Sequence, residues 1–424
     1  MDVLVVGGGA REHALCLALR RDPSVASLWC APGNAGTTEV ATNEPVDASD
    51  PVAVADLAVR LGADLVVVGP EGPLVAGAAD AVRDKGIACF GPSAAAARLE
   101  GSKAFAKDVM AAAGVPTAQS RLCASAHEVA AALDAFGPPY VVKADGLAAG
   151  KGVVVTDDRQ AALEHAAACG QVVVEEYLAG PEVSLFCITD GTTVVPLAPA
   201  QDFKRDGDGD TGPNTGGMGA YSPLPWAASG LVDDVVRLVA RPTVDALRAD
   251  GTLFSGLLYC GLVLTEGGIK VIEFNARFGD PETQVVLARL TSPLGVVLAA
   301  AASGTLAEVA PLEWSDDAAV TVVIAANGYP AAPKTGDLVD GVDDANDVPG
   351  VHVLHAGTRR ADDGSVLSDG GRVVSVTATA PTLAQARARA YEAVDRIALV
   401  GSHHRTDIAA AAADGVDEGT IVAS

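Results

Sequence analysis

The feature that most constrains the fold is a repeated alternation of strand and helix in the first hundred residues. Apolar runs typical of buried strands occur at Val3–Val6, Leu65–Val68 and Ile87–Phe90, and a helical pattern occupies Arg11–Arg20. The strands end in turns rich in glycine or proline. Strands that alternate with helices form a parallel sheet, and the turns at its carboxyl edge are where such sheets bind ligands. We therefore expect a doubly wound N-terminal domain over residues 1–100.

The rest of the chain predicts two further units. Strand-rich sequence fills most of residues 101–328, and its polar, glycine-rich stretch Gln201–Tyr221 is expected to form a long loop. After about residue 330, short strands with Gly/Asp turns precede a helix expected at Leu383–Leu399. This pattern predicts a small α+β domain over residues 329–424. The fold class is thus α/β and α+β, with several domains.

Composition restricts the possible partners. The 424-residue chain carries a formal net charge of -25, and an acidic surface repels nucleic acid and anionic membranes. No apolar run reaches the ~18 residues of a membrane span, and the N-terminus lacks the pattern of a secretory leader. The seven cysteines are scattered without a C-x-x-C pair, which is typical of reduced thiols. We expect a cytoplasmic monomer, with a weak homodimer as the alternative, and small molecules as its partners.

The first turn of the predicted sheet, Gly7–His13, follows a strand and opens a helix. Backbone N–H groups in this position bind phosphate. Glu12 stands where a dinucleotide-binding fingerprint requires its third glycine, so nicotinamide binding is disfavoured. A turn that binds a phosphosugar is the favoured interpretation, and a purely structural tight turn is the alternative.

Two lysines flank an Ala/Gly-rich segment, Lys143–Gly152, between two predicted strands. Three residues rather than four separate its glycines, and Lys151 is followed by Gly152, so it is not a Walker A loop. A hairpin of this composition can place N–H groups over a triphosphate. Lys151 would move with the hairpin, while Lys143 would hold a fixed charge on a strand. The alternative is a flexible hairpin with solvated lysines.

The strongest single signal is Glu273 and Asn275 at the end of a predicted strand. Side chains two residues apart point to the same face of a strand, and carboxylate and amide oxygens suit Mg²⁺. Asparagine is unfavourable within a strand, which favours a functional role. Arg277 follows one alternation later and could meet the charge that develops during phosphoryl transfer. A solvated edge strand is the alternative.

Two other segments carry weaker signals. Val172–Leu178 runs from an apolar strand into acids, and such a strand end can bind an adenine edge and offer a carboxylate to ribose. Asp210–Tyr221 combines Gly, Asn and Thr and offers many backbone donors. We interpret it as a substrate-binding loop, with a disordered surface loop as the alternative.

Together these segments resemble the ATP-grasp superfamily and, within it, the phosphoribosylamine–glycine ligase family of purine biosynthesis. The resemblance covers essentially the whole chain. Asp210–Tyr221 and Glu273–Gln284 are the parts specific to the glycine ligases, whereas the lysine loop and the acid-x-Asn pair are shared across ATP-grasp enzymes. The resemblance implies a Rossmann-like N-terminal domain and an ATP-grasp domain at 101–328, with a mobile lid at about 117–186.

The resemblance also implies a reaction with ATP and Mg²⁺ or Mn²⁺. The glycine carboxylate attacks the γ-phosphate of ATP and forms glycyl phosphate. The amine of 5-phosphoribosylamine then displaces the phosphate, which gives glycinamide ribonucleotide, ADP and phosphate. No protein nucleophile is required, so positioning and charge stabilisation should dominate.

Residue roles follow from the same resemblance. ATP would be held by Lys103, Lys143, Gly150, Lys151 and Gly152 at its phosphates, by Glu175 and Leu178 at adenine and by Glu182 at ribose. Glu273 and Asn275 would bind the metal. Arg277 and the turn Gly279, Asp280 and Pro281 would face the reacting groups, with Lys143, Arg277 and Asp280 as catalytic residues. The phosphosugar and glycine would meet Gly9, Arg11, Glu12, Thr215, Gly217 and Met218.

The chain departs from the family pattern in places. Phe203 stands where histidine is common, Ala409 stands where glycine is usual, and the segment between Thr156 and Gln171 is shorter than usual. Two rival interpretations remain. One is another ATP-grasp ligase or carboxylase that uses a different acid or amine. The other is a non-catalytic nucleotide-binding protein, which the presence of Glu273, Asn275 and Lys143 disfavours.

Overall fold

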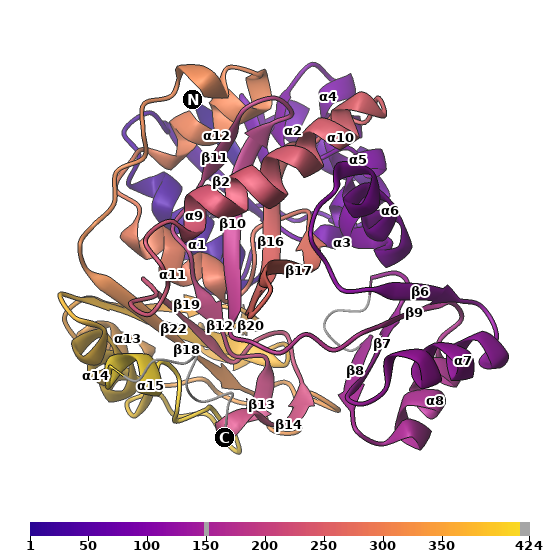
Figure 1. The fold of residues 1–424 in the computed structure, drawn as a ribbon. Helices are drawn as coiled ribbons and strands as arrows, with labels where there is room; N and C mark the ends of the chain where they lie inside the picture. Colours follow the sequence, from indigo (N-terminus) through magenta and orange to yellow (C-terminus); the bar gives the residue numbers. More distant parts are fainter. Residues whose placement is uncertain (148–151, 416–424) are drawn as a thin grey trace.

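A computed structural model describes residues 1–147 and 152–415. Its sheets form an N-terminal unit, a central unit with a lid beside it, and a C-terminal unit (Figure 1). The predicted fold class of α/β and α+β domains is confirmed. No helix in the described ranges is long and apolar enough to cross a membrane.

The N-terminal unit is built on a parallel sheet with strand order β3-β2-β1-β4-β5. The prediction of a doubly wound sheet is confirmed, because the side chains of β1 and β4 are buried on both faces. The strands are β1 (Asp2–Gly7), β2 (Ser27–Pro32), β3 (Thr42–Asn43), β4 (Leu65–Val68) and β5 (Ala88–Phe90). The helices are α1 (Ala10–Arg20), η1 (Thr37–Glu39), α2 (Pro51–Leu61), α3 (Glu71–Ala76), α4 (Ala78–Asp84) and α5 (Ala94–Gly101).

The central unit contains an antiparallel sheet with order β11-β10-β16-β17. It shares a core with the N-terminal unit, since the ring of Phe278 lies 5.9 Å from both Phe90 and Phe186. The strands are β10 (Glu182–Asp190), β11 (Val194–Pro196), β16 (Ser255–Thr265) and β17 (Gly268–Asn275). The helices are α6 (Lys103–Ala113), α9 (Leu231–Val235), the π-helical turn η3 (Val236–Ala240), α10 (Arg241–Ala249), α11 (Glu282–Arg289), α12 (Leu294–Ser303) and η4 (Leu306–Glu308).

The lid is an antiparallel sheet of order β6-β9-β7-β8 with two helices, and it stands to one side of the central unit (Figure 1). Its buried apolar cluster shares no residue with the other buried clusters. The expected lid at about 117–186 includes the first residues of β10, which pairs with β16 of the central sheet. The lid elements are β6 (Ser120–Cys123), α7 (Ala126–Phe136), β7 (Tyr140–Ala144), β8 (Val153–Thr156), α8 (Arg159–Ala168) and β9 (Val172–Glu175).

The C-terminal unit is built on a sheet of order β12-β15-β18-β22-β19. Strand β18 (Ala318–Ala325) begins before the expected boundary at 328/329, yet it pairs with β22 along its whole length. The remaining strands are β19 (Val351–His355), β20 (Thr358–Arg360), β21 (Val366–Ser368) and β22 (Arg372–Ala380). The helices are α13 (Val342–Asn346), α14 (Leu383–Val394) and α15 (Ala410–Ala413), so the expected helix at Leu383–Leu399 ends five residues early.

The expectation of a long loop at Gln201–Tyr221 is wrong. This stretch supplies the outer strands β12 (Gln201–Asp202) and β15 (Gly219–Ser222) of the C-terminal sheet, and a hairpin of β13 (Arg205–Gly207) and β14 (Thr211–Asn214), with the 3-10 turn η2 (Asp208–Asp210) between them. Glycine and proline depress strand propensity, so pairing with distant β18 decides the structure here.

Candidate active site

A cleft of about 870 Å³ lies where the lid, the central sheet and the C-terminal unit meet. Most of the predicted site residues line it: Arg11, Lys103, Lys143, Gly152, Glu175, Leu178, Glu182, Thr215, Glu273, Asn275, Arg277 and Asp280. Six other predicted site residues do not line it: Gly9, Glu12, Gly217, Met218, Gly279 and Pro281. Gly150 and Lys151 lie outside the described residues.

Lys143 forms the centre of the lysine end of the cleft. Its Nζ lies 2.9 Å from Glu175 Oε2 and donates to the carbonyl of Ile272 at 2.9 Å. Ile272 is an extra residue in β17 at the point where its register with β16 shifts. Lys107 Nζ lies 3.0 Å from the other oxygen of Glu175. The carboxylate of Glu175, predicted to contact adenine, therefore holds two lysines in place.

The metal pair sits on the cleft side of β17. Glu273 and Asn275 are two residues apart, opposite Gly261 and Tyr259 of β16, and both line the cleft. Burial acts to raise the pKa of Glu273, but the lysines around it, with Lys204 first, hold that pKa below its usual value. An ionised carboxylate beside an amide oxygen is a fitting pair for a hard cation that keeps several other oxygen ligands.

Lys204 lies among carboxylates close to Glu273. It forms an ion pair with Glu182 and lies 3.8 Å from Asp202. Burial raises the pKa of Asp202 to about 7, and the negative charges of Glu282 and Glu182 act in the same direction. The ammonium group of Lys204 lowers this pKa but does not offset these effects. Glu182, predicted to bind ribose, faces the cleft through this network.

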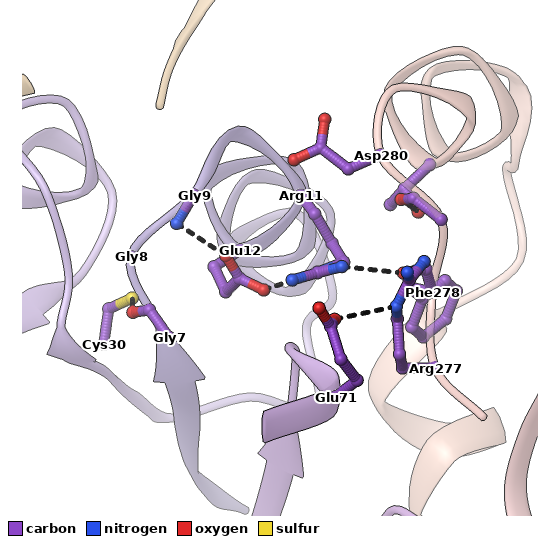
Figure 2. Close-up of polar contacts among 12 residues, drawn as sticks. Gly7, Gly8, Gly9, Arg11, Glu12, Cys30, Glu71, Arg277, Phe278 and Asp280 are labelled. Atoms are coloured by element: carbon purple, nitrogen blue, oxygen red, sulfur yellow. Dashed lines mark hydrogen bonds and ion pairs between the residues drawn. The ribbon is translucent and has the colours of Figure 1, made fainter. Parts of the chain in front are cut away.

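Arg277 begins the arginine end of the cleft. Its guanidinium lies 3.1 Å from Glu71 (Figure 2). It also lies 3.0 Å from Glu100 and donates to the carbonyl of Phe278 at 3.2 Å. Burial acts to lower the pKa of Arg277, yet Glu100 and Glu71 outweigh it and raise that pKa. A fixed cation in a partly dry site is suited to a developing anion.

Arg11 reaches the same carbonyl from the N-terminal unit. Its Nη1 donates to the Phe278 oxygen at 3.0 Å, and its Nε donates to Glu12 at 2.6 Å (Figure 2). The second oxygen of Glu12 accepts from the backbone N–H of Gly9 at 2.6 Å. Glu12 thus caps its own helix and orients Arg11, and its side chain is only 1% exposed.

The Asp280–Pro281 turn closes this end against the C-terminal unit. Arg372 Nη1 donates to the carbonyls of Asp280 and Gly216, each at 2.7 Å, and lies 3.4 Å from the Asp280 carboxylate. Gly217 has a φ of 111°, and a Cβ there would clash with Pro281. The glycine is therefore required by this close approach.

Thr215 and Met218 of the predicted substrate loop have different surroundings, since Thr215 lines the cleft and Met218 does not. Thr215 Oγ1 accepts from the N–H of Gly217 at 2.9 Å and donates to the carbonyl of Lys204 at 2.9 Å. Met218 is completely buried.

The carboxylate of Asp280 is ionised at this end of the cleft. Burial tends to raise the pKa of Asp280, but Arg372 and Arg11 keep that pKa below its usual value.

Comparison with known proteins gives this cleft a context. Family models of phosphoribosylglycinamide synthetase match residues 1–100 (N domain), 101–283 (ATP-grasp domain) and 319–411 (C domain). The phosphoribosylamine–glycine ligase of Streptomyces coelicolor is 68% identical over 97% of this chain and 100% of its own. The chain belongs to the phosphoribosylamine–glycine ligase family.

Two other members of the family also match this chain over nearly its full length. The Mycobacterium tuberculosis ligase is 57% identical over 98% of this chain and 99% of its own. The crystal structure of the Thermotoga maritima ligase superposes with a TM-score of 0.83 at 32% identity, over 96% of this chain and 100% of that one. Members of this family are ATP-dependent ligases, and the ATP-grasp expectation is confirmed.

Several cleft residues carried no assigned role in the sequence. Lys107 and Glu282 sit within helices α6 and α11, and Asp202 and Lys204 precede the predicted substrate loop. Arg372 begins β22, more than 90 residues beyond Asp280 in the chain, so only the sheet pairing brings it to the cleft. Arg405 lies over the ring of Phe203 at 4.9 Å and donates to Asp210 at 2.7 Å. Its Arg-x-Asp pattern with Asp407 was the one available signal.

Proposed function

We propose that this chain uses ATP to ligate glycine to 5-phosphoribosylamine, giving glycinamide ribonucleotide, ADP and phosphate. The observation that carries the proposal is the single cleft in which a lysine end and an arginine end meet at Glu273 and Asn275. Full-length identity with ligases of that name supports the choice of substrates.

ATP fits the lysine end. Lys103, Lys107 and Lys143 line the cleft there, and Lys103 and Lys107 each lie close enough to Lys143 to interact with its charge. A triphosphate needs several such cations. Leu178 and the strand end at Glu175 line the same wall, where they would border adenine, with Glu182 towards ribose. Lys103 and Lys143 would contact the phosphates as point charges.

A divalent cation, Mg²⁺ or Mn²⁺, would be held by Glu273 and Asn275. The low pKa of Glu273 suits a hard cation, and phosphate oxygens and water would fill the other positions. When bound, the ion would supply charge neutralisation at the transferring phosphoryl group. The residues of the chain supply the orientation described next.

The reaction would take place between the two ends. A glycine carboxylate oxygen attacks the γ-phosphorus, the bond to the β–γ bridging oxygen breaks, and ADP leaves. The amine of phosphoribosylamine then attacks the carbonyl carbon of glycyl phosphate, loses a proton and expels phosphate. Arg277 and Arg11 would face the anionic groups, and the ionised Asp280 would bind an amino group.

The experiment that tests this proposal measures ADP release with ATP, glycine and freshly prepared phosphoribosylamine. Release should require both substrates, and omission of either should return the rate to background. Bicarbonate in place of glycine is the control for an ATP-grasp carboxylase. Background rates with the complete mixture, or release that bicarbonate supports and glycine does not, would contradict the proposal.

Three further expectations stay predictions. They are a monomer rather than a weak homodimer, a cytoplasmic location, and domain limits at 1–100, 101–328 and 329–424 with a lid at about 117–186.

A further inference from the structure

The lid is joined to the rest of the protein by polar contacts. Among the described residues, the apolar cluster of the lid is separate from those of the other units. Ion pairs cross the boundary instead: Lys107 with Glu175 at 3.0 Å, and Lys270 with Glu176 at 3.3 Å. Each such contact therefore helps to set where the lid's ATP-facing residues lie.

One of these contacts lies at the entrance to the glycine-rich loop. Asp145 follows β7 directly, and its Oδ1 accepts from the backbone N–H of Lys103 at 2.6 Å and of Ala104 at 3.2 Å. Its Oδ2 accepts from the hydroxyl of Ser102 at 3.3 Å. A lid carboxylate thus caps the N-terminus of α6, a helix of the central unit.

The capping of α6 is shared between the two units. The first turn of a helix has four N–H groups without helical partners. In α6, the N–H of Ser102 donates to the carbonyl of Arg98 at 2.8 Å, and the N–H of Phe105 donates to the hydroxyl of Ser102 at 3.2 Å. Asp145 takes the other two. Without the lid in this position, those two N–H groups would lose their partner.

The contact is reciprocal and includes a predicted phosphate ligand. Lys103 Nζ donates to the carbonyl of Gly146 at 2.9 Å, so the residue whose N–H Asp145 binds also binds the residue after Asp145. Asp145 does not line the cleft, whereas Gly146 and Lys103 do. Its carboxylate also occupies the positive end of α6, which leaves ATP phosphates to the lysine side chains.

We propose that Asp145 is a positioning residue for ATP: it docks the end of β7 on α6 and so fixes Lys103 and Gly146 relative to Lys143. The inference rests on the proposed function, because it assigns the lysine end to ATP. Asp145 acts through these neighbours and does not touch the substrate itself.

The test compares Asp145→Ala and Asp145→Asn with the matched control Asp158→Ala. Asp158 caps α8 in the same way, accepting from Gln160 N–H at 2.8 Å and Ala161 N–H at 3.3 Å, but all three residues are in the lid. The readouts are the ATP dissociation constant, titrated without glycine, and the KM values of the full reaction.

Asp145→Ala removes a charged acceptor from two N–H groups, so it should weaken ATP binding about tenfold or more. Asp145→Asn keeps an acceptor and should fall between Asp145→Ala and the wild type. KM for glycine should stay within about twofold, and Asp158→Ala should bind ATP as the wild type does while its Tm falls by a few degrees.

Two results would overturn the role of Asp145. One is wild-type ATP affinity in both Asp145 variants, and the other is an equal loss in Asp158→Ala, which would indicate general destabilisation of the lid. A wild-type protein that binds no ATP would instead refute the proposed function. The Asp145→Asn variant keeps the test decisive if the alanine variant fails to fold.

Discussion

The two ends of the cleft are built on different kinds of interface. At the lysine end, Lys143 and Glu175 belong to a lid with its own apolar cluster, and they meet the central unit through polar contacts. At the arginine end, Arg11 and Arg277 donate to one backbone carbonyl, and Arg372 donates to three. The position of the ATP-binding residues therefore depends on the position of the lid. The substrate end, in contrast, is held by hydrogen bonds that join the N-terminal, central and C-terminal units.

The largest expected effect lies at the junction of the two ends. Glu273→Gln keeps the shape of the side chain but removes its charge. Turnover should fall about 100-fold or more, because a metal supplies several kcal/mol of transition-state stabilisation, while the ATP dissociation constant changes by less than about threefold. Glu266→Gln, in the exposed turn between the same two strands, is the control. Wild-type turnover in Glu273→Gln would refute the metal assignment.

The next largest effect is expected from a substitution at the arginine end, which should change KM for the substrates but not KM for ATP. Arg372→Lys keeps the charge but loses the planar donor group that serves Gly216, Gly217 and Asp280. We expect KM for glycine or phosphoribosylamine to rise about tenfold, the effect of about 1.4 kcal/mol, with KM for ATP unchanged. Arg359→Lys, a half-exposed arginine of the same unit, is the control. A rise for ATP alone would reverse the assignment of the ends.

Acid should weaken the contact between the N-terminal and C-terminal units that supports the arginine end. His13 of α1 accepts from the backbone N–H of His355 in β19 at 2.9 Å, at the contact between the N-terminal and C-terminal units. Burial lowers the pKa of His13 to about 3 and that of His355 to about 4. The folded protein holds both neutral, whereas unfolded histidines protonate near ~6.5, so their contribution is full above that pH and is lost as pH falls towards 4.

The expected loss is about 2 kcal/mol for each histidine between pH 6.5 and pH 5. Denaturant unfolding at the two pH values measures it, and His13→Asn, which offers an acceptor that does not titrate, isolates the contribution of His13. KM for the substrates should rise in acid before KM for ATP does. Equal pH dependence in His13→Asn and the wild type would remove His13 from this account.

The smallest expected effect concerns the support of the substrate loop. Phe203 lies under Arg405 and 6.2 Å from the ring of Tyr221. Phe203→Ala should raise KM for glycine about threefold or more, since a cation–π contact is worth at least about 0.5–1 kcal/mol. Phe203→His restores an aromatic ring and should return KM towards the wild-type value. No difference between the two variants would exclude a role for the ring.

The residues that could be predicted share a local signal. Strand periodicity predicts Glu273 and Asn275, because it places both on one face, and the glycine-rich turn before a helix predicts a binding turn at Gly7–His13, within which the family resemblance adds Arg11. Glu12 stands three residues after Gly9, a spacing typical of a capping side chain, and this local signal competed with the substrate role. The strands of Gln201–Tyr221 have no such signal, because glycine-rich strands depend on their partners. Arg372 comes to the cleft only through sheet pairing.

The central claim is that both ends of the cleft act in one reaction through glycyl phosphate. The most direct measurement is the fate of oxygen in glycine whose carboxylate carries ¹⁸O. Attack of that carboxylate on the γ-phosphorus forms an O–P bond, and the amine later breaks the adjacent C–O bond, so the released phosphate should carry one ¹⁸O from glycine. Phosphate released at the same rate as product but without ¹⁸O would contradict the account.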